Sequence, residues 1–328
     1  MRKHILQFFG GCAIVSTVVA SVFWYVGNHY SNYSAEKNII VDQTNDDYVV
    51  DLFQKRNISK NSFVTKIYLK IFRFFKKNVL FGEYELPTHV SIIDALNIIT
   101  SGNVVIHKIC IPEGFSVAQV VDRLNANEYL QGQILDTPKE GSLMPDTYRF
   151  KYPATKQAII LMASHAMNKF ILEAWENRPD NCMLKSAYEL IILASIVEKE
   201  RTKTDAKIIA KIYLNRLQIN MPLQADPTVI YAITHGRRLG RPLTFKDLKE
   251  KIPGNTYVYK GLPETPICNP SREAIEAVLY PSNHDFLFFA HDSSGRIYLA
   301  KTYKEHLCNA KIIRSTFDKS LFKKEQVK

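Results

Sequence analysis

The second half of the chain contains the segment Ser186-Ala-Tyr-Glu-Leu-Ile-Ile-Leu-Ala-Ser-Ile-Val-Glu-Lys-Glu-Arg201. Ser186, with Glu189 three residues later, has the pattern of a helix N-terminus. The run from Leu190 to Val197 is almost entirely apolar, whereas an exposed helix would carry a polar stripe. This stretch therefore predicts a central buried helix around which a helix-rich domain is built.

The charged end of this helix holds the first candidate catalytic group. At about 100° per residue, Lys199 points to the polar side, whereas Glu198 and Glu200 fall on the flanks of the apolar surface. A carboxyl group among aliphatic side chains loses hydration, which raises its pKa and suits it to act as a general acid near neutral pH. The alternative is that both glutamates form ion pairs with the basic residues at the helix end.

Helical and hairpin patterns surround the central helix. Apolar spacing predicts a helix over Gln157–Trp175 and an amphipathic helix over Ala206–Leu217. Near the C-terminus, Phe286–Ala290 and Arg296–Ala300 flank a Ser-Ser-Gly turn and predict a β-hairpin. The second domain is therefore expected to be mixed, with a small antiparallel element.

Two segments between these elements carry polar residues suited to a binding loop. Leu223–Tyr231 contains Asp226 and Thr228 beside a proline, and we expect a rigid turn followed by an extended run. Asn255-Thr-Tyr257 leads into a proline-rich loop over 261–270. Rigid loops with amide, hydroxyl and aromatic groups suit sugar recognition, and the alternative is an ordinary ordered loop.

The segment before the second domain predicts a small module. Strand patterns at Asn38–Val41, Glu83–Leu86 and Val104–Ile111 alternate with helices that Ser91 and Ser116 would cap. The two strand–helix units over residues 83–124 make a compact module that is too small to bury an active site, so a binding or positioning role suits it better.

Ser62–Lys77, which precedes these units, predicts an amphipathic helix. Its basic residues fall on one face: Lys66, Lys70, Arg73 and Lys77. The favoured interpretation is a solvated face over a core stripe that includes Phe63, Ile67 and Phe74. The alternative is contact with anionic lipid headgroups or a wall polymer.

The N-terminus predicts a membrane anchor. Ile5–Val26 is 22 residues long without a charge, follows Arg2 and Lys3, and ends beside Trp24 and Tyr25. We expect residues 1–27 to form a cytoplasmic stub and one transmembrane helix, 28–37 a polar tether, and the rest to lie outside the cytoplasm. The alternative is a cleaved signal peptide, whose apolar run is usually shorter.

Composition excludes several classes of protein. With 328 residues, 46% apolar and 23% charged, the chain can bury a core and is not disordered as a whole. The net charge of +11 favours an anionic environment, and the predicted location makes nucleic acid a poor partner. The five cysteines, at 12, 110, 182, 268 and 308, have no metal-site spacing and give no disulfide connectivity. Nucleotide, zinc-protease and serine-hydrolase motifs are absent, so we expect carboxylate chemistry with no metal and no cofactor.

Several ordered motifs together resemble the membrane-anchored endolytic murein transglycosylases. The resemblance covers nearly the whole chain, and agreement in sequence order is more specific than any single motif. The motifs are Gly82-Glu-Tyr84, Pro112-Glu-Gly114, Glu140-Gly141, Pro145-Asp-Thr-Tyr148, Ala194–Glu200, Asn215-Arg-Leu217, Met221–Tyr231, Asn255–Tyr257 and Gly261-Leu-Pro263.

The resemblance implies an α+β chain with an N-terminal transmembrane helix, a LysM-like β/α module over 38–126 and a helix-rich mixed catalytic domain over 127–328. It implies an enzyme on the periplasmic side of the bacterial cytoplasmic membrane that cleaves within peptidoglycan glycan strands and leaves 1,6-anhydro-N-acetylmuramyl ends. Glu200 would be the general acid and base, with no second nucleophilic carboxylate. The residues in motif positions that would line the cleft are Glu198, Asp226, Thr228, Asn255 and Tyr257. The family also suggests coordination with peptidoglycan synthases.

Four positions depart from the pattern of that family, and two other functions stay open. Glu264, Ser271, Arg296 and Leu307 stand where proline, glycine, histidine and asparagine are expected. These departures affect fine substrate positioning and not the catalytic glutamate. The rival functions are a catalytically silent, membrane-anchored wall-binding scaffold and an anchored hydrolase that uses water.

Overall fold

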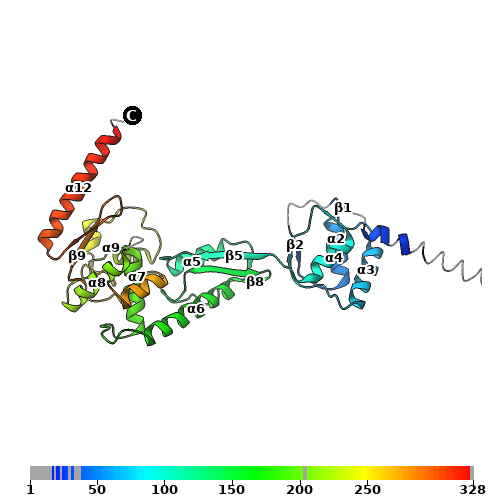
Figure 1. Ribbon diagram of the computed structural model, residues 1–328, viewed down its shortest axis with the longest axis horizontal. Helices are drawn as coiled ribbons and strands as arrows, with labels where there is room; N and C mark the ends of the chain where they lie inside the picture. Colours follow the sequence, from blue (N-terminus) through cyan, green and yellow to red (C-terminus); the bar gives the residue numbers. More distant parts are fainter. Residues whose placement is uncertain are drawn as a thin grey trace, which may run out of the picture. The chain divides into compact units, whose positions relative to one another are not determined.

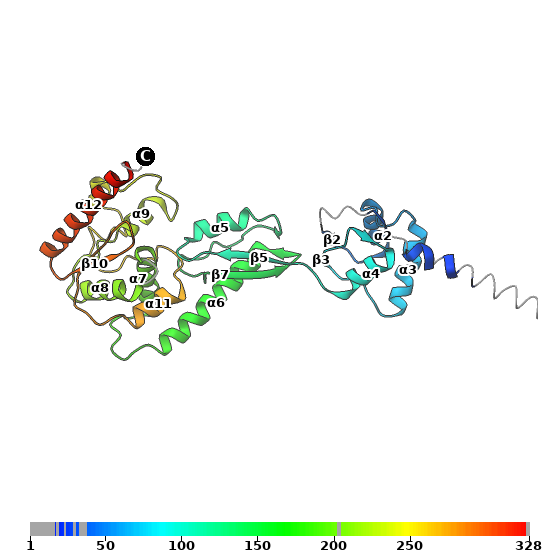
Figure 2. The same ribbon diagram turned by 45° about the horizontal axis from the view of Figure 1, so that its top comes forward.

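The structure is a computed structural model with a mixed α/β fold (Figures 1 and 2). It describes residues 17, 20–22, 24–28, 31–32, 38–201 and 205–325. These residues form two compact units. The first contains the described residues up to Lys108 with 129–131 and 149–154, and the second contains the remainder.

The described part of the first unit contains helices and short strand pairs. The helices are α2 (Asp46–Lys55), α3 (Ser62–Phe74) and α4 (Ile92–Ser101). The strands pair antiparallel, β2 (Ile39–Val41) with β3 (Gly82–Tyr84) and β1 (Ser31–Asn32) with β4 (His89–Val90). Ser91 caps α4 as predicted, because its side chain accepts a hydrogen bond from the Asp94 amide. Phe53, Leu69, Tyr84 and Leu96 are fully buried in one core.

The predicted membrane anchor lies largely outside the described residues. Of Ile5–Val26, the structure describes residues 17, 20–22 and 24–26. Within the part of the chain that is described, no helix has both the length and the apolar character that crossing a bilayer requires.

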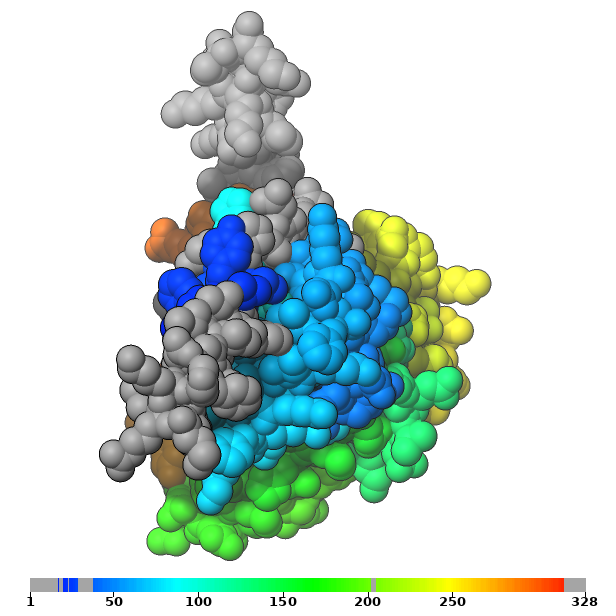
Figure 3. Space-filling view, turned by 90° about the vertical axis from the view of Figure 1, so that its right-hand side faces the viewer, coloured from blue at the N-terminus to red at the C-terminus, as the bar shows by residue number. Residues whose placement is uncertain are grey.

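Helix α3 corrects the predicted core stripe. Phe63 and Phe74 are 66% and 82% exposed, whereas the face in the core carries Val64, Tyr68, Leu69 and Phe72. Helical spacing alone had placed Phe63 and Phe74 inside, because it finds an apolar stripe without revealing which stripe the neighbouring helices cover. The α3 segment, in blue, forms part of the surface nearest the viewer in Figure 3.

The second unit confirms the central buried helix. Helix α7 (Ala187–Glu200) begins after Ser186, whose side chain accepts a hydrogen bond from the Glu189 amide, and its residues from Ile192 to Val197 are buried. Helices α8 (Ala206–Gln218) and α11 (Arg272–Leu279) pack against α7 and against each other. Their apolar side chains form the core of this unit.

The predicted long helix and hairpin are also present. Helix α6 is Lys156–Glu176, and β9 (Phe288–His291) pairs antiparallel with β10 (Ile297–Ala300). Helix α12 (Tyr303–Glu325) packs on both strands of this hairpin. The hairpin and α12 thereby form one wall near the end of α7.

The segment after Asp226 corrects a second prediction. Instead of an extended run, Asp226–Thr234 forms helix α9, with its proline in the first turn. Proline is favoured there because the missing amide hydrogen would have no partner in the helix, and an acidic residue in the first turn suits the helix dipole. A short helix, α10 (Phe245–Lys249), follows.

The chain over residues 104–155 is divided between the two units at positions other than the bounds of the predicted module of 38–126. From Ile109 to Glu128, which includes half of β5 (Ile106–Ile111) and all of α5 (Val117–Asn125), the chain belongs to the second unit. The remaining strands of this region are β6 (Leu130–Gln131), β7 (Asp146–Lys151) and β8 (Ala154–Thr155), with β5 paired to β7 and β6 to β8. The capping box of Ser116 is confirmed, and the same hydroxyl donates to the Gly236 carbonyl at 2.8 Å. This bond helps to explain why α5 stays with the second unit.

Candidate active site

Glu200 is the last residue of α7, and its side chain lines a pocket. The helix stops there because Arg201 takes an extended backbone conformation, with φ −69° and ψ 148°. The pocket has a volume of about 410 Å³ and lies wholly within the second unit. Its lining residues are Glu200, Tyr213, Arg216, Gln224, Asp226, Tyr257, Phe288, Phe289, Ala290, His291, Tyr303 and His306.

The surroundings of Glu200 favour its protonated form. Burial, and then the nearby negative charge of Asp226, raise the pKa of Glu200 to about 7. The Tyr213 hydroxyl donates a hydrogen bond to the Glu200 carboxylate, and this bond and the charge of Arg216 act in the opposite direction. Glu200 is therefore a carboxyl group that can either hold or release a proton at neutral pH.

Arg216 adds a positive charge to the pocket lining. It is buried, its Nε donates to the Leu287 carbonyl at 2.7 Å and its Nη1 donates to the Leu223 carbonyl. Burial lowers the pKa of this guanidinium. Because its hydrogen bonds go to neutral carbonyls, its charge remains available to stabilise a carboxylate at Glu200.

Asp226, the first residue of α9, and Tyr257 are brought together in the pocket lining. The Tyr257 hydroxyl donates to Asp226 Oδ1 at 2.6 Å, and both residues line the pocket. Burial, followed by the bond to Asp226, raises the pKa of Tyr257, so the hydroxyl keeps its proton and remains a donor. Gln224, beside them, has a positive φ of 50°, a conformation that non-glycine residues adopt mainly where the surrounding structure imposes it.

Thr228 and Asn255 lie behind this pair, not in the pocket lining. Thr228 Oγ1 is 2.8 Å from Thr256 Oγ1, and Thr256 Oγ1 accepts the Ala225 amide at 3.0 Å. Asn255 is fully buried, and its side-chain nitrogen donates to the carbonyls of Asp247, Leu248 and Glu250. Its oxygen accepts the Tyr257 amide. Both side chains therefore hold in place the start of α9, which carries Asp226, and the segment that carries Tyr257.

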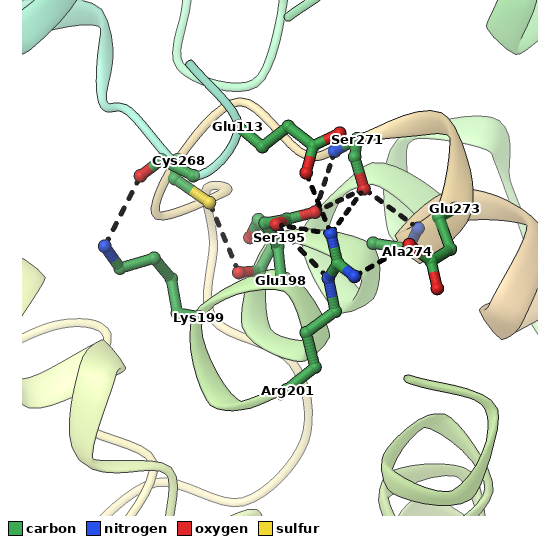
Figure 4. A network of polar contacts seen from close by, with 10 residues as sticks. Glu113, Ser195, Glu198, Lys199, Arg201, Cys268, Ser271, Glu273 and Ala274 are labelled. Atoms are coloured by element: carbon green, nitrogen blue, oxygen red, sulfur yellow. Dashed lines mark hydrogen bonds and ion pairs between the residues drawn. The ribbon is translucent and has the colours of Figure 1, made fainter. Parts of the chain in front are cut away.

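Glu198 faces a separate polar network, shown in Figure 4. Its Oε1 accepts hydrogen bonds from the Arg201 guanidinium, and its Oε2 accepts the amide and hydroxyl of Ser271. Arg201 also pairs with Glu113 and Glu273. Glu198 thus holds the end of α7 to the start of α11, where Ser271, one of the positions that depart from the family pattern, is the N-cap.

The sequence patterns did not predict that the hairpin and α12 form one wall of the pocket. His291 and His306 line the pocket, and His291 Nε2 lies 2.5 Å from Asp205 Oδ2. The His306 ring stacks on Phe288 with centroids 5.5 Å apart. Burial lowers the pKa of His306. Tyr213 and Arg216 were visible in the sequence only as members of a helix pattern and of the Asn215-Arg-Leu217 motif.

The described residues include no cluster of three or more His, Cys, Asp or Glu side chains that could hold a metal ion. The cysteines at 110, 182, 268 and 308 are free thiols. The pocket offers one carboxyl group that exchanges a proton near neutrality, a second carboxylate and an aromatic wall. Such a set is suited to general acid–base chemistry.

The chain belongs to the YceG-like family, whose model matches residues 39–312. It is 39% identical over 170 residues to the endolytic murein transglycosylase of Bacillus subtilis (strain 168), in an alignment that covers 52% of this chain and 46% of that one. It is 33% identical over 174 residues to the endolytic murein transglycosylase of Streptococcus pneumoniae serotype 2 (strain D39 / NCTC 7466), covering 51% and 31%. The chain thus spans less than half the length of these curated relatives.

A solved structure supports the fold. The crystal structure of a YceG-like protein from Listeria monocytogenes aligns with a TM-score of 0.52 at 28% identity, covering 83% of this chain and 99% of that one. The family assigned from the ordered motifs is therefore confirmed.

Proposed function

We propose that this protein is an endolytic peptidoglycan lytic transglycosylase, with Glu200 as its general acid and base. The observation that carries the proposal is the position of Glu200: a largely buried carboxyl group, with a pKa raised to about 7, that faces a pocket shared with Asp226 and Tyr257. The names of the B. subtilis and S. pneumoniae relatives support the same activity.

The reaction begins with proton transfer. The Glu200 carboxyl donates its proton to the oxygen that joins N-acetylmuramate C1 to N-acetylglucosamine C4, and the C1–O bond breaks with its electrons going to that oxygen. The muramyl C6 hydroxyl then attacks C1, and its proton passes to the Glu200 carboxylate. The products are a 1,6-anhydro-muramyl end and a free C4 hydroxyl, with no water consumed and Glu200 again protonated.

The neighbours of Glu200 fit the two halves of this cycle. Burial and the charge of Asp226 keep the proton on Glu200 before cleavage. After cleavage, the Tyr213 hydroxyl and Arg216 stabilise the carboxylate that must act as base. Asp226, fixed by Tyr257, is suited to stabilise positive charge that develops at C1. Three residues outside the pocket lining hold the segments that carry these groups: Thr228, Asn255 and Glu198.

The placement of the enzyme follows from the N-terminal pattern and is part of the proposal. One helix over the predicted anchor would hold the chain in the bacterial cytoplasmic membrane, with the LysM-like first unit and the catalytic unit in the periplasm. Glycan strands are the substrate, and peptidoglycan synthases are the partners that such a location would bring within reach.

The test is the identity of the product. Purified sacculi are digested with the full chain, and the released fragments are analysed by mass spectrometry. We expect anhydro-muropeptides, 18 Da lighter than the corresponding reducing-end species because no water is added. Fragments with reducing ends would identify a hydrolase, and intact strands after prolonged incubation would identify a silent scaffold. Either result would overturn the proposal.

A further inference from the structure

A second pocket lies beside the first, on the other side of the same backbone segments. Its volume is about 710 Å³, and it too belongs to the second unit. Lys199 and Pro227 line it, whereas their chain neighbours Glu200 and Asp226 line the first pocket. A ligand in the second pocket is therefore a close neighbour of whatever occupies the first.

One face of α9 forms the wall of this pocket. Pro227, Ile230, Tyr231 and Thr234 follow the spacing of a single helix face and all line it. The loop after α9 forms the rim and is fastened at three places. Ser116 Oγ donates to the Gly236 carbonyl at 2.8 Å, Arg237 pairs with Asp122, and Arg241 pairs with Asp247.

The pocket has two positive charges that remain available to a ligand. Arg237 and Arg241 form the ion pairs that fasten the loop, so a carboxylate already partners each of them. Glu113, the acidic residue of the lining, is paired with Arg201. Lys199 donates at 3.4 Å to the Gly114 carbonyl, a neutral group. Within the described part of the chain, neither Lys199 nor Arg238 has a carboxylate partner. Fixed loops that present unpaired cations are suited to bind anionic groups.

We propose that this pocket binds the peptide that is attached to the lactyl group of the muramyl residue, with Lys199 and Arg238 recognising its carboxylates. The inference rests on the proposed function, because it assumes a glycan strand in the first pocket. The sugar rings of that strand carry no charge, so its carboxylates are on the peptide. The volume of the pocket is within the range of about 300–1,000 Å³ typical of small-ligand sites.

The test is equilibrium binding that does not depend on catalysis. The full chain with Glu200→Gln is titrated by calorimetry with two chemically defined tetrasaccharides: one carries pentapeptides on its lactyl carboxyl groups, and in the other these groups are capped as methylamides, so that they carry no charge. We expect the peptide-bearing ligand to bind about tenfold more tightly at low salt, as two partly exposed charge pairs would provide. Adding Lys199→Gln and Arg238→Gln should remove this difference, whereas the control Arg178→Gln should retain it.

Equal binding of both ligands by the Glu200→Gln chain would overturn the inference, as would a preference that survives the double substitution. Neither result bears on product chemistry, so the failure of this inference and the failure of the proposed function can be told apart. A preference for inorganic phosphate over the peptide in competition would assign the pocket to a phosphate-bearing ligand and would also overturn it.

A different observation, the exposed face of α3, carries a second inference. Phe63, Ile71 and Phe74 lie on one side of this helix and are 66%, 42% and 82% exposed. Phe75, Leu80 and Phe81, just beyond its end, are exposed as well. An exposed apolar cluster of this size is typical of an interaction surface.

Basic residues follow the edge of this apolar stripe. Lys66, Lys70, Arg73 and Lys77 lie on the adjoining face; Lys66 and Arg73 pair with Asp47 and Asp46. Lys70 and Lys77 have no carboxylate partner within the described residues, although Lys77 bonds the Asn97 side chain. An apolar stripe edged by lysines matches the boundary between acyl chains and anionic headgroups. We infer that α3 lies on the surface of a bilayer.

Depth-dependent quenching tests this inference on the full chain. Phe74→Trp is made in a Trp24→Phe, Trp175→Phe background and reconstituted in vesicles of phosphatidylglycerol and phosphatidylcholine. We expect blue-shifted emission and strong quenching by lipids brominated on the acyl chains. The control is Phe245→Trp, a similarly exposed position in the second unit, which should be quenched by aqueous acrylamide instead. If tryptophan at position 74 behaves like the control, α3 does not contact the bilayer.

Discussion

Tyr257 donates a 2.6 Å hydrogen bond to Oδ1 of Asp226, the first residue of α9, which lies 31 residues earlier in the chain. The bond fixes the second carboxylate of the pocket at a set distance from the end of α7. The start of α9 and the segment that carries Tyr257 are also held by buried polar side chains, those of Thr228, Thr256 and Asn255. The geometry of the proposed site therefore depends on the packing behind Asp226 and Tyr257 as well as on Glu200.

Removing this bond should slow the reaction without unfolding the protein. We expect Tyr257→Phe to lower kcat about tenfold, because a hydrogen bond to a charged group contributes about 1.5–3 kcal/mol. Initial rates on solubilised glycan strands measure the effect. Tyr259→Phe, a nearby exposed tyrosine outside the lining of this pocket, is the matched control and should retain the full rate.

The rate should fall as the pH rises above about 7, because Glu200 must be protonated to start the reaction. Asp226 raises the pKa of Glu200, so Asp226→Asn should move this alkaline limb to lower pH while also reducing the maximal rate. pH–rate profiles of both proteins measure the shift. An alkaline limb that stays in place would show that Asp226 does not act on the titrating group.

The raised pKa of Glu200 also predicts a pH-dependent stability. A carboxyl group whose pKa is higher in the folded state stabilises the fold when protonated, and this contribution is lost as the pH rises from about 4.5 through about 7. Glu200→Gln removes the cost of burying a charge, so above pH 7 it should be more stable than the wild type by about 3 kcal/mol. Urea unfolding at pH 5 and pH 8 measures the difference, which should be much smaller at pH 5.

Asn255→Ala should destabilise the second unit. The substitution removes the donor to three carbonyls and the acceptor for the Tyr257 amide, all in a buried position, at a cost of about 2–4 kcal/mol. Thermal unfolding measures the loss. The exposed Asn283→Ala should leave the unfolding temperature unchanged, and an equal effect of both substitutions would contradict the role given to Asn255.

Glu198→Gln should be milder for activity than any change at Glu200. Glu198 contacts Arg201 and Ser271, not the pocket, so we expect most of the rate to remain and stability to fall by about 1–3 kcal/mol. Glu273→Gln, which alters an exposed partner of the same arginine, should cost less. Equal loss of activity at positions 198 and 200 would reopen the choice between the two glutamates.

The sequence predicted those elements that depend mainly on a few residues adjacent in the chain. The apolar run of α7, the serine caps of α4, α5 and α7, and the Ser-Ser-Gly hairpin all appear as expected, because a helix cap or a tight turn depends on a few adjacent residues. The family was found in the same way, from motifs whose order is preserved.

Predictions that depended on tertiary packing were less successful. The spacing of α3 placed Phe63 and Phe74 in the core, and only the neighbouring helices determine which side is covered. The proline after Asp226 suggested a turn, but the structure uses it to start α9. Arg216 and His306 reach the pocket from elements distant in sequence, so no local pattern marks them as part of the site.

The most direct measurement is the digestion of purified sacculi by the full chain with Glu200→Gln, with the wild type run in parallel. Glutamine keeps the size and hydrogen-bonding groups of the side chain but carries no acidic proton. We expect the variant to be folded, to bind glycan strands and to release no anhydro-muropeptides. Release at the wild-type rate would contradict the proposed role of Glu200, because another group would then have to supply the proton.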